Sequence, residues 1–207
     1  MGRTEYNVST ISWIADHNSI VQNSGRKINW DQVVDTDGAG NKKMDSGQIV
    51  SLYGDGIAPR KDAEITLSGA TEDGAGEATH TASADHGLAV GNTVIIAGYA
   101  TSEYNGTFKV TSVPTATTFT VEGVTGTPDD DGGGGTATPK AIGFLLESIN
   151  AGERERSVTG QAVIIGGVFY DNLLPDSSET DFDTFISEVD DSGNGVTLES
   201  YEDNRVS

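Results

Sequence analysis

Cysteine is missing from this sequence of 207 residues, and basic residues are few. Without cysteine the chain has no disulfide, no thiol nucleophile and no cysteine-ligated zinc site. It holds 12 lysines and arginines against 32 aspartates and glutamates, which gives a formal net charge of −20. Nucleic acids and anionic lipid surfaces both attract clustered basic side chains. The composition therefore predicts neither nucleic acid nor a membrane among the partners.

Long apolar runs are missing as well. No stretch approaches the roughly 18 apolar residues of a membrane-spanning helix, and residues 1–18 lack the apolar core of a signal peptide. Isoleucine, valine and glycine are abundant instead. The 14 isoleucines and 17 valines far outnumber the 8 leucines, and there are 27 glycines. Because β-branched side chains suit strands better than helices, the composition predicts a mainly β fold with many tight turns.

The composition also divides the chain. Residues 67–139 hold 15 of the 23 threonines and a single basic residue, Lys109. Stretches rich in glycine and aspartate border this segment at 68–76 and 127–136, and we expect them to be flexible connectors. Strands are predicted within it at 88–96, 104–111 and 118–121. We expect residues 67–139 to form an inserted Ig-like β module, either a β-sandwich or a small barrel.

The flanking residues, 31–66 and 140–207, are expected to form one discontinuous small β domain. Its predicted strands are 28–34, 47–53, 141–146, 161–169 and 196–198. The spacing of Phe182, Phe185, Ile186 and Val189 predicts one short C-terminal amphipathic helix over 181–189. Tolerated insertions join points that are close in space, so we expect Thr66 and Lys140 to be neighbours.

Four short motifs occur in order in this flanking domain: KMDSGQIV at 43–50, GDGIAP at 54–59, AIGFLL at 141–146, and GGVF followed by LP within 166–175. This order resembles the lambda-type head-decoration (capsid-stabilising) proteins of tailed phages. The inserted segment, from HGLAVGNTV at 86–94 to TTFTV at 117–121, resembles a small β module common in phage virion proteins.

The resemblance implies a cement protein without enzymatic activity or a cofactor, on the outer surface of the expanded capsid. Its partners would be the major capsid protein and two further copies of itself, in a homotrimer at threefold or quasi-threefold positions. Residues 1–30 would be a capsid-binding arm that adds a strand to the capsid protein. From their apolar character we predict five arm contacts: Tyr6, Val8, Ile11, Trp13 and Ile14. In the alternative interpretation, Trp13 and Ile14 pack on their own domain.

Charge is unevenly distributed along the chain. Residues 1–66 carry seven bases and nine acids, whereas residues 140–207 carry four bases and fourteen acids. A nearly neutral side facing the capsid and an acidic outer side would suit an outer-surface protein. An acidic proteome, with acidic surfaces in general, explains the same imbalance equally well.

A second hypothesis assigns the chain to a phage tail or baseplate, or to a host-surface adhesin whose inserted module binds glycans. Tyr99 and Tyr104 are its candidate glycan contacts, and Phe108 is close to them in sequence. Aromatic residues in a small β module more often belong to its core. Host-surface glycans therefore stay open as a further partner.

Catalytic and metal-binding patterns are weak. Asp45 and Asp191 each begin an Asp-Ser-Gly tripeptide like that of aspartic proteases, but turn chemistry explains both. The acidic stretch 35–41 lacks the ligands that an EF-hand needs at its fifth and twelfth positions. His80 and His86 lack zinc-site spacing, and we expect them at the surface or in turns. The sequence predicts no enzyme and no metal site.

Overall fold

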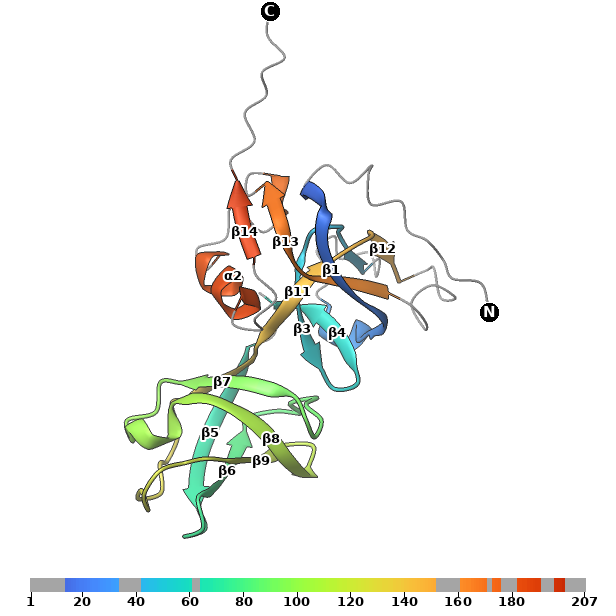
Figure 1. Cartoon of the computed structure of the whole chain (residues 1–207). Coiled ribbons are helices and arrows are strands. Elements are labelled where there is room, and N and C mark those ends of the chain that lie inside the picture. Colours follow the sequence, from blue (N-terminus) through green and yellow to red (C-terminus); the bar gives the residue numbers. More distant parts are fainter. Residues whose placement is uncertain are drawn as a thin grey trace, which may run out of the picture.

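The computed structural model describes residues 14–33, 42–60, 64–151, 161–170, 173–175, 182–190 and 196–199. Within these ranges the chain is mainly β, with one α-helix and short 3-10 turns. Figure 1 shows two groups of strands, a curled sheet and a closed barrel, which we call the sheet body and the barrel. The predicted fold class, a mainly β chain with one short helix, is confirmed.

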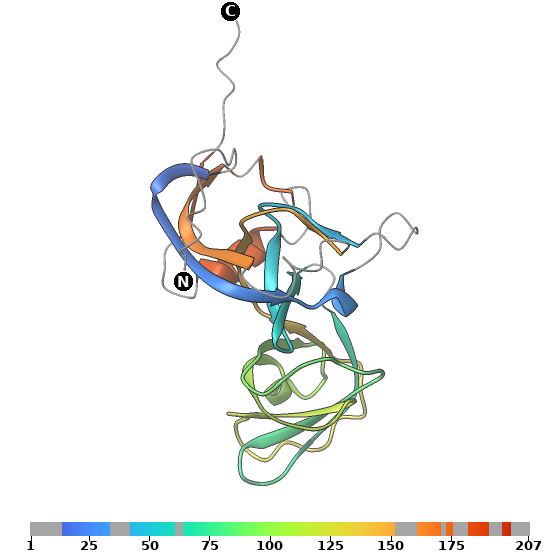
Figure 2. The same cartoon turned by 90° about the vertical axis from the view of Figure 1, so that its right-hand side faces the viewer.

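The sheet body contains six strands in the order β1-β4-β3-β11-β13-β14. Because β1 pairs with β13 as well as with β4, the sheet curls back on itself, and Figure 2 shows β1 arching along its outside. A short separate pair joins β2 to β12. The bounds are β1 Ile14–Ile28, β2 Lys43–Met44, β3 Ile49–Tyr53, β4 Gly56–Pro59, β11 Ala141–Leu145, β12 Ile149–Asn150, β13 Gln161–Tyr170 and β14 Val196–Glu199.

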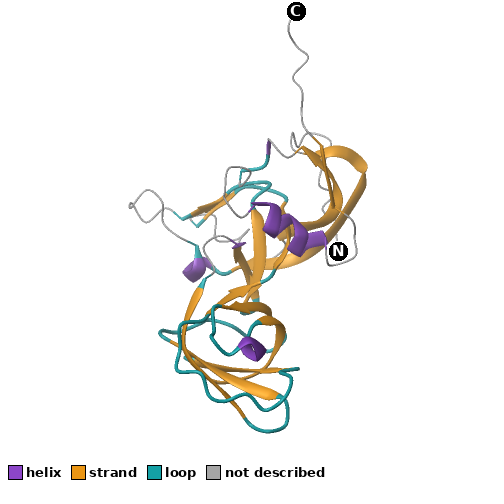
Figure 3. Ribbon diagram, turned by 90° about the vertical axis from the view of Figure 1, so that its left-hand side faces the viewer, coloured by secondary structure: helices purple, strands orange, loops and turns teal. Residues whose placement is uncertain are grey.

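The helix α2 (Phe182–Asp190) lies against strands of the sheet body, as Figure 3 shows. Its two phenylalanines, Phe182 and Phe185, join a buried cluster with Phe144 of β11 and Phe169 of β13. The ring centroids of Phe144 and Phe169 are 4.6 Å apart, a normal contact between aromatic rings. The apolar spacing of the sequence therefore predicted this helix correctly.

The barrel closes in the order β10-β5-β6-β9-β8-β7. Its last strand, β10, pairs with both β5 and β7 and so leaves the barrel without a free edge. Side chains alternate between interior and surface; in β6, Ala78, His80 and Ala82 are the buried ones. The bounds are β5 Ile65–Glu72, β6 Glu77–Ala82, β7 Thr93–Ala97, β8 Gly106–Thr115, β9 Thr118–Glu122 and β10 Thr136–Pro139.

The first stretch expected to be a flexible connector, and the second from Asp131 onward, are hydrogen-bonded parts of the barrel, so that expectation was wrong for them. Residues 68–76 contain most of β5 and its turn into β6, where the Glu72 carboxylate accepts the N–H groups of Gly74 and Gly76 at 2.8 and 2.9 Å. In the second stretch, Asp131 pairs with Ala70 of β5 through backbone hydrogen bonds, and Thr136 begins β10. Composition alone did not reveal that the Glu72 carboxylate stabilises a tight turn.

Part of the segment expected to be an arm lies within the sheet body. Residues 14–28 form β1, which is antiparallel to β13 and parallel to the start of β4. Ile14, one of the five predicted arm contacts, begins this strand and is in register with Phe169. The β-branched residues of this segment favour a strand, and β1 pairs along one edge of β13. Tyr6, Val8, Ile11 and Trp13 lie outside the described residues.

Candidate functional site

The turn of the β3–β4 hairpin is inserted against one end of the barrel. Tyr53, at the end of β3, is 3% exposed and belongs to the hydrophobic core of the barrel. Next to it, the Gly54 N–H donates to Asn92 Oδ1 at 2.9 Å, and Asn92 Nδ2 donates back to the Gly54 carbonyl at 3.0 Å. Asn92 is itself buried and also accepts the Ala89 N–H. This reciprocal pair fixes the hairpin to the barrel loop.

Two glycines permit this close contact. Gly87 has a φ of +64°, and a Cβ atom there would lie 2.6 Å from the Tyr53 ring. A Cβ atom on Gly54, whose φ is +66°, would lie 3.1 Å from the Gly87 carbonyl oxygen. Both positions therefore need glycine, for the backbone conformation and for the space. Burial in this contact raises the pKa of Tyr53 to about 12.

The chain crosses between the sheet body and the barrel at two places, and side chains tie both crossings together. Where β10 continues into β11, Ser51 Oγ donates to the Pro139 carbonyl at 2.7 Å and the Ala141 N–H donates to Glu188 Oε2 at 2.7 Å. Where β4 leaves the sheet body, Arg60 forms a bidentate ion pair with the same Glu188, at 2.8 and 2.6 Å. Glu188 of α2 therefore anchors both crossings.

The Arg60–Glu188 pair is buried, since the two side chains are 10% and 6% exposed. The Arg60 guanidinium also lies over the Phe185 ring, 4.7 Å from its centroid. Bidentate geometry with additional hydrogen bonds is what a buried ion pair needs to offset its desolvation. We call this pair, the Tyr53–Gly54 turn and Asn92 the mount, because together they hold the barrel on the sheet body.

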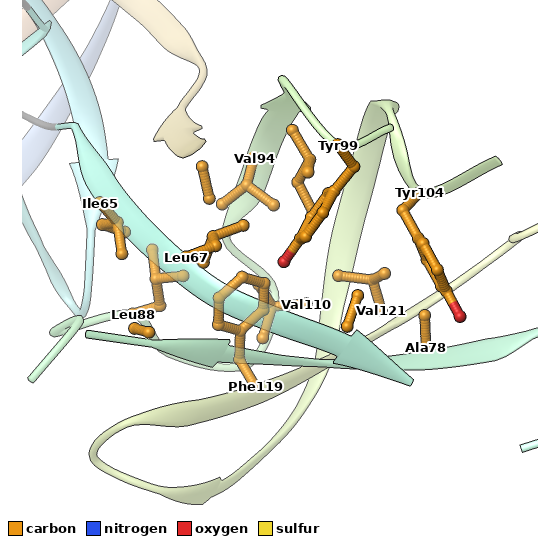
Figure 4. Close-up of a cluster of buried hydrophobic side chains, with 14 of the residues drawn as sticks. Ile65, Leu67, Ala78, Leu88, Val94, Tyr99, Tyr104, Val110, Phe119 and Val121 are labelled. Carbon is orange, nitrogen blue, oxygen red and sulfur yellow. The ribbon is translucent and has the colours of Figure 1, made fainter. Parts of the chain in front are cut away.

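Tyr99 and Tyr104, the predicted glycan contacts, are 5% and 0% exposed and lie in the barrel core, as Figure 4 shows. Tyr99 Oη donates to the Gly69 carbonyl at 2.9 Å, and burial raises the pKa of Tyr99. Ring contacts join Tyr99 to Tyr104, with centroids 5.7 Å apart. A buried ring offers no face to a sugar, so the glycan-contact prediction for these two residues was wrong. The alternative weighed with it, a place in the core, fits their burial.

His80 and His86 are also in the barrel interior, at 0% and 1% exposed, so neither is at the surface. His80 is on β6, against the expectation of a surface or turn position, whereas His86 lies in the connection after β6, where its Nδ1 accepts the Leu88 N–H at 3.0 Å. The His80 ring stacks on Phe119 with centroids 5.3 Å apart. Its Nδ1 lies 3.3 Å from Tyr99 Oη, and since that hydroxyl donates its hydrogen to Gly69, His80 Nδ1 is the donor. Burial lowers the pKa of His80 to about 4, so the ring is neutral at physiological pH.

A groove of about 450 Å³ opens on the barrel beside the 3-10 turn η4 (Ser102–Tyr104). Phe108 of β8 is its only aromatic side chain; the other lining side chains are those of Ser102, Glu103, Asn105, Thr107 and Thr125. The Tyr99 backbone holds the Asn105 side chain: Asn105 Oδ1 accepts the Tyr99 N–H at 3.0 Å, and Asn105 Nδ2 donates to the Tyr99 carbonyl at 2.9 Å. In this groove, polar side chains of the barrel therefore converge around an accessible aromatic ring.

The first Asp-Ser-Gly tripeptide lies in a turn, where Asp45 pairs with Lys43 at 2.5 Å and Gly47 has a φ of +84°. The Asp45 carbonyl accepts the N–H of Gln48, which closes that turn. Asp191 and the acidic stretch 35–41 lie outside the described residues. Within the described ranges, no three acidic or histidine side chains gather as metal ligands would, and no helix has the length and apolarity to cross a membrane.

Sequence reasoning missed the mount, although one signal for it was readable. Glu188 lies three residues after Phe185, on the apolar face of the predicted helix, and a charge there needs a buried partner. The Asn92–Gly54 pair joins residues 38 positions apart and had no comparable signal. The groove depends on how η4 turns back over β8, which no local pattern predicts.

Comparison with known proteins gives little more. No family model matches this chain, and no curated protein does. One similar solved structure is a phage phi92 endosialidase, with 22% sequence identity over 52% of this chain, 14% of that chain and a TM-score of 0.31. The similar part is thus a small fraction of the endosialidase, and a similarity at this score carries no inference about function.

Proposed function

We propose that this protein is a structural component of a phage virion that binds the outside of the expanded capsid. In this role the sheet body contacts the major capsid protein and the barrel projects outward. The observation that carries the proposal is where the family-like motifs lie. The motif at 43–50 covers β2 and the start of β3, and those at 54–59, 141–146 and 166–175 cover β4, β11 and most of the second half of β13. β4, β3, β11 and β13 are consecutive neighbours in one sheet, so the motifs mark one structural unit.

Charge supports contact through the N-terminal part of the sheet body. Residues 1–64 hold nine acids and seven bases, whereas the barrel, residues 65–139, holds nine acids and one base, and residues 140–207 hold fourteen acids and four bases. A nearly neutral segment suits contact with a protein shell, and an acidic barrel keeps neighbouring copies apart by repulsion. Since the whole chain carries a charge of −20, self-association into a trimer needs a specific surface, and a shell that presents threefold positions supplies the matching symmetry.

The mount supports the same proposal. A barrel tied to the sheet body at two chain crossings and one hairpin has a fixed orientation relative to whatever the sheet body binds. Binding requires complementary surfaces rather than a reactive constellation, and a virion component of this kind works without catalysis. Residues before β1, with Tyr6, Val8, Ile11 and Trp13 among them, remain our proposed capsid contacts.

Co-sedimentation of the full chain with capsid shells of its phage, unexpanded and expanded, tests the proposal. We expect binding to expanded shells alone, saturating at a fixed ratio to the capsid protein. Deletion of residues 2–13 should abolish this binding and leave the thermal unfolding curve intact, because β1 begins at Ile14. A longer deletion, of residues 2–20, would also remove half of β1, so a loss of binding could then come from a damaged fold. Absence of binding to either shell contradicts the capsid role.

A further inference from the structure

The groove beside η4 lies at the end of the barrel opposite the mount. β7 starts at the mount, where Thr93 accepts a backbone hydrogen bond from Lys140, and it runs away from there to Ala97. The groove is lined by residues that follow β7, begin β8 and follow β9, so it sits where β7 ends. A barrel that projects from its support therefore carries this groove at its far end.

The lining combines one aromatic ring with many hydrogen-bonding groups. Phe108 is half-buried: one part of its ring packs on the barrel core, and the ring also lines the groove. A Cβ atom on Gly106 would lie 3.2 Å from this ring, and one on Gly123 would meet nothing within 4 Å. Gly106 thus leaves the space beside the ring open, and a side chain at position 123 would start in open space. The hydroxyls of Thr107 and Thr125 lie on exposed residues at its rim.

Part of this polar rim is held in place before any ligand arrives. Both polar atoms of the Asn105 side chain are bonded to the Tyr99 backbone, which sets the position of η4 relative to the barrel. Glu103 is the only charged residue in the lining, and its Oε2 accepts a hydrogen bond from Ser102 Oγ at 3.0 Å. A rim fixed in this way loses little conformational entropy on binding.

We propose that this groove binds a neutral saccharide. A sugar ring has an apolar face of C–H groups and a rim of hydroxyls, which match an aromatic side chain surrounded by hydroxyl and carboxylate groups. Peptides with apolar anchors need more apolar lining than one ring. Anionic ligands need a cation, and the barrel has a single base, Lys109, against nine acids. A charge of this sign disfavours sialylated or phosphorylated glycans.

This inference goes beyond the proposed capsid role and does not depend on it, because the groove is far from the mount and the sheet body. The two proposals also fail separately. Co-sedimentation with shells tests the sheet body, whereas saccharide binding tests the barrel end. A variant blocked at the groove should therefore still bind expanded shells.

The experiment applies the full chain to an array of neutral oligosaccharides of hexoses and N-acetylhexosamines, printed beside sialylated forms of the same cores. The strongest neutral binder is then titrated by NMR, with amide shifts followed for residues 102–108 and 123–125. Thr125→Trp should fill the groove and weaken binding at least tenfold. Phe108→Leu keeps the apolar contact with the core but removes the aromatic face, and we expect a similar loss.

Thr81→Trp is the matched control, because Thr81 is exposed on β6 and does not line the groove. It should bind as the unmodified chain does, and all three variants should unfold within a few degrees of one another. The proposal is overturned if no neutral saccharide binds, if the sialylated forms bind better, or if Thr125→Trp binds as well as Thr81→Trp.

Discussion

The barrel and the sheet body bring their strands together in different ways. In the barrel, β5 pairs with β6, β7 with β8 and β8 with β9 in sequence order, β6 pairs with β9, and β10 closes the ring. In the sheet body, by contrast, β3 pairs with β11 across the entire barrel segment, and β1 pairs with β13 across most of the chain. Local pairings form at a lower entropic cost than distant ones. The barrel is therefore the unit better suited to fold by itself.

The barrel also lowers the entropic cost of forming the sheet body. Ala137 of β10 is in register with Ile65 of β5, so the two ends of the inserted segment are neighbours. Once the barrel is folded, it acts as a short connection between β4 and β11 rather than as a loop of more than seventy residues. The difference between the two regions implies an order of folding, in which the barrel forms first and the sheet body closes around its ends.

Substitution of Glu188 should have the largest effect on stability and should separate the two regions. Glu188→Ala leaves the buried Arg60 guanidinium and the Ala141 N–H without their acceptor, and we expect a loss of about 3–5 kcal/mol. Denaturant unfolding of the full chain measures the loss. Hydrogen exchange locates it, and protection should fall in β11 and α2 while the barrel strands keep theirs.

The double variant Arg60→Met with Glu188→Met is the control for that prediction. Removing both charges leaves no unpaired ion, so the double variant should be more stable than Glu188→Ala. A loss below about 1 kcal/mol for Glu188→Ala would mean that water reaches Arg60, and the mount would then not depend on this pair.

Sequence patterns predicted the local parts of this fold and the nearness of the two ends of the insertion, and they missed the other distant pairings. Alternating apolar residues located β9, and the spacing of Phe182, Phe185 and Val189 located α2, because both depend on near neighbours. The pairing of β1 with β13 joins segments that no short pattern connects. Glycine and aspartate at 68–76 suggested a flexible connector, but the Glu72 carboxylate binds backbone N–H groups there, which composition does not reveal.

The sequence located only part of the candidate site. Phe108, which lines the groove, was noted only as close in sequence to the predicted glycan contacts, whereas the predicted contacts themselves, Tyr99 and Tyr104, are buried. Tyr104 follows Ser102 and Glu103 in a polar stretch, yet η4 turns its ring into the core. Whether an aromatic side chain in a polar loop points inward depends on backbone geometry that local sequence does not determine.

Acid should destabilise the barrel through His80. Its pKa is about 4 in the folded barrel and 6.5 in an unfolded chain, so between these pH values the unfolded state binds a proton that the folded state excludes. Stability is therefore full above pH 6.5 and falls as the pH drops towards 4, by about 3 kcal/mol in total. Thermal unfolding at a series of pH values between 7 and 4 measures this slope.

The variant His80→Phe retains a ring against Phe119 and loses the titration, so its stability should change less across the same range. Asp55 and Asp131 do not account for the slope, because hydrogen bonds lower the pKa of both carboxyls below 3.8 and move their effect to more acid conditions. Parallel curves for the two proteins would show that the His80 ring is hydrated.

Substitution of Gly87 tests how firmly the two regions are joined. Gly87→Ala introduces a Cβ atom 2.6 Å from the Tyr53 ring at a φ of +64°, whereas Gly91→Ala, in the same loop at φ +94°, meets nothing within 4 Å. Both variants carry backbone strain of about 1–3 kcal/mol, but only the first displaces the hairpin. NMR relaxation should show separate tumbling of the barrel for Gly87→Ala alone, and equal behaviour of both variants would contradict the close contact at Tyr53.

The smallest expected effects come from two buried tyrosines of the barrel core and have opposite signs. Tyr99→Phe removes the hydroxyl that donates to the Gly69 carbonyl and accepts from His80, and should cost about 1–2 kcal/mol. Tyr104 Oη is buried without a hydrogen-bond partner among the described residues, so Tyr104→Phe should be neutral or stabilise the barrel by up to about 1 kcal/mol. Urea unfolding of both variants compares them directly. A loss at Tyr104 as large as that at Tyr99 would mean that a buried water binds its hydroxyl, and the barrel interior would then be wetter than its packing implies.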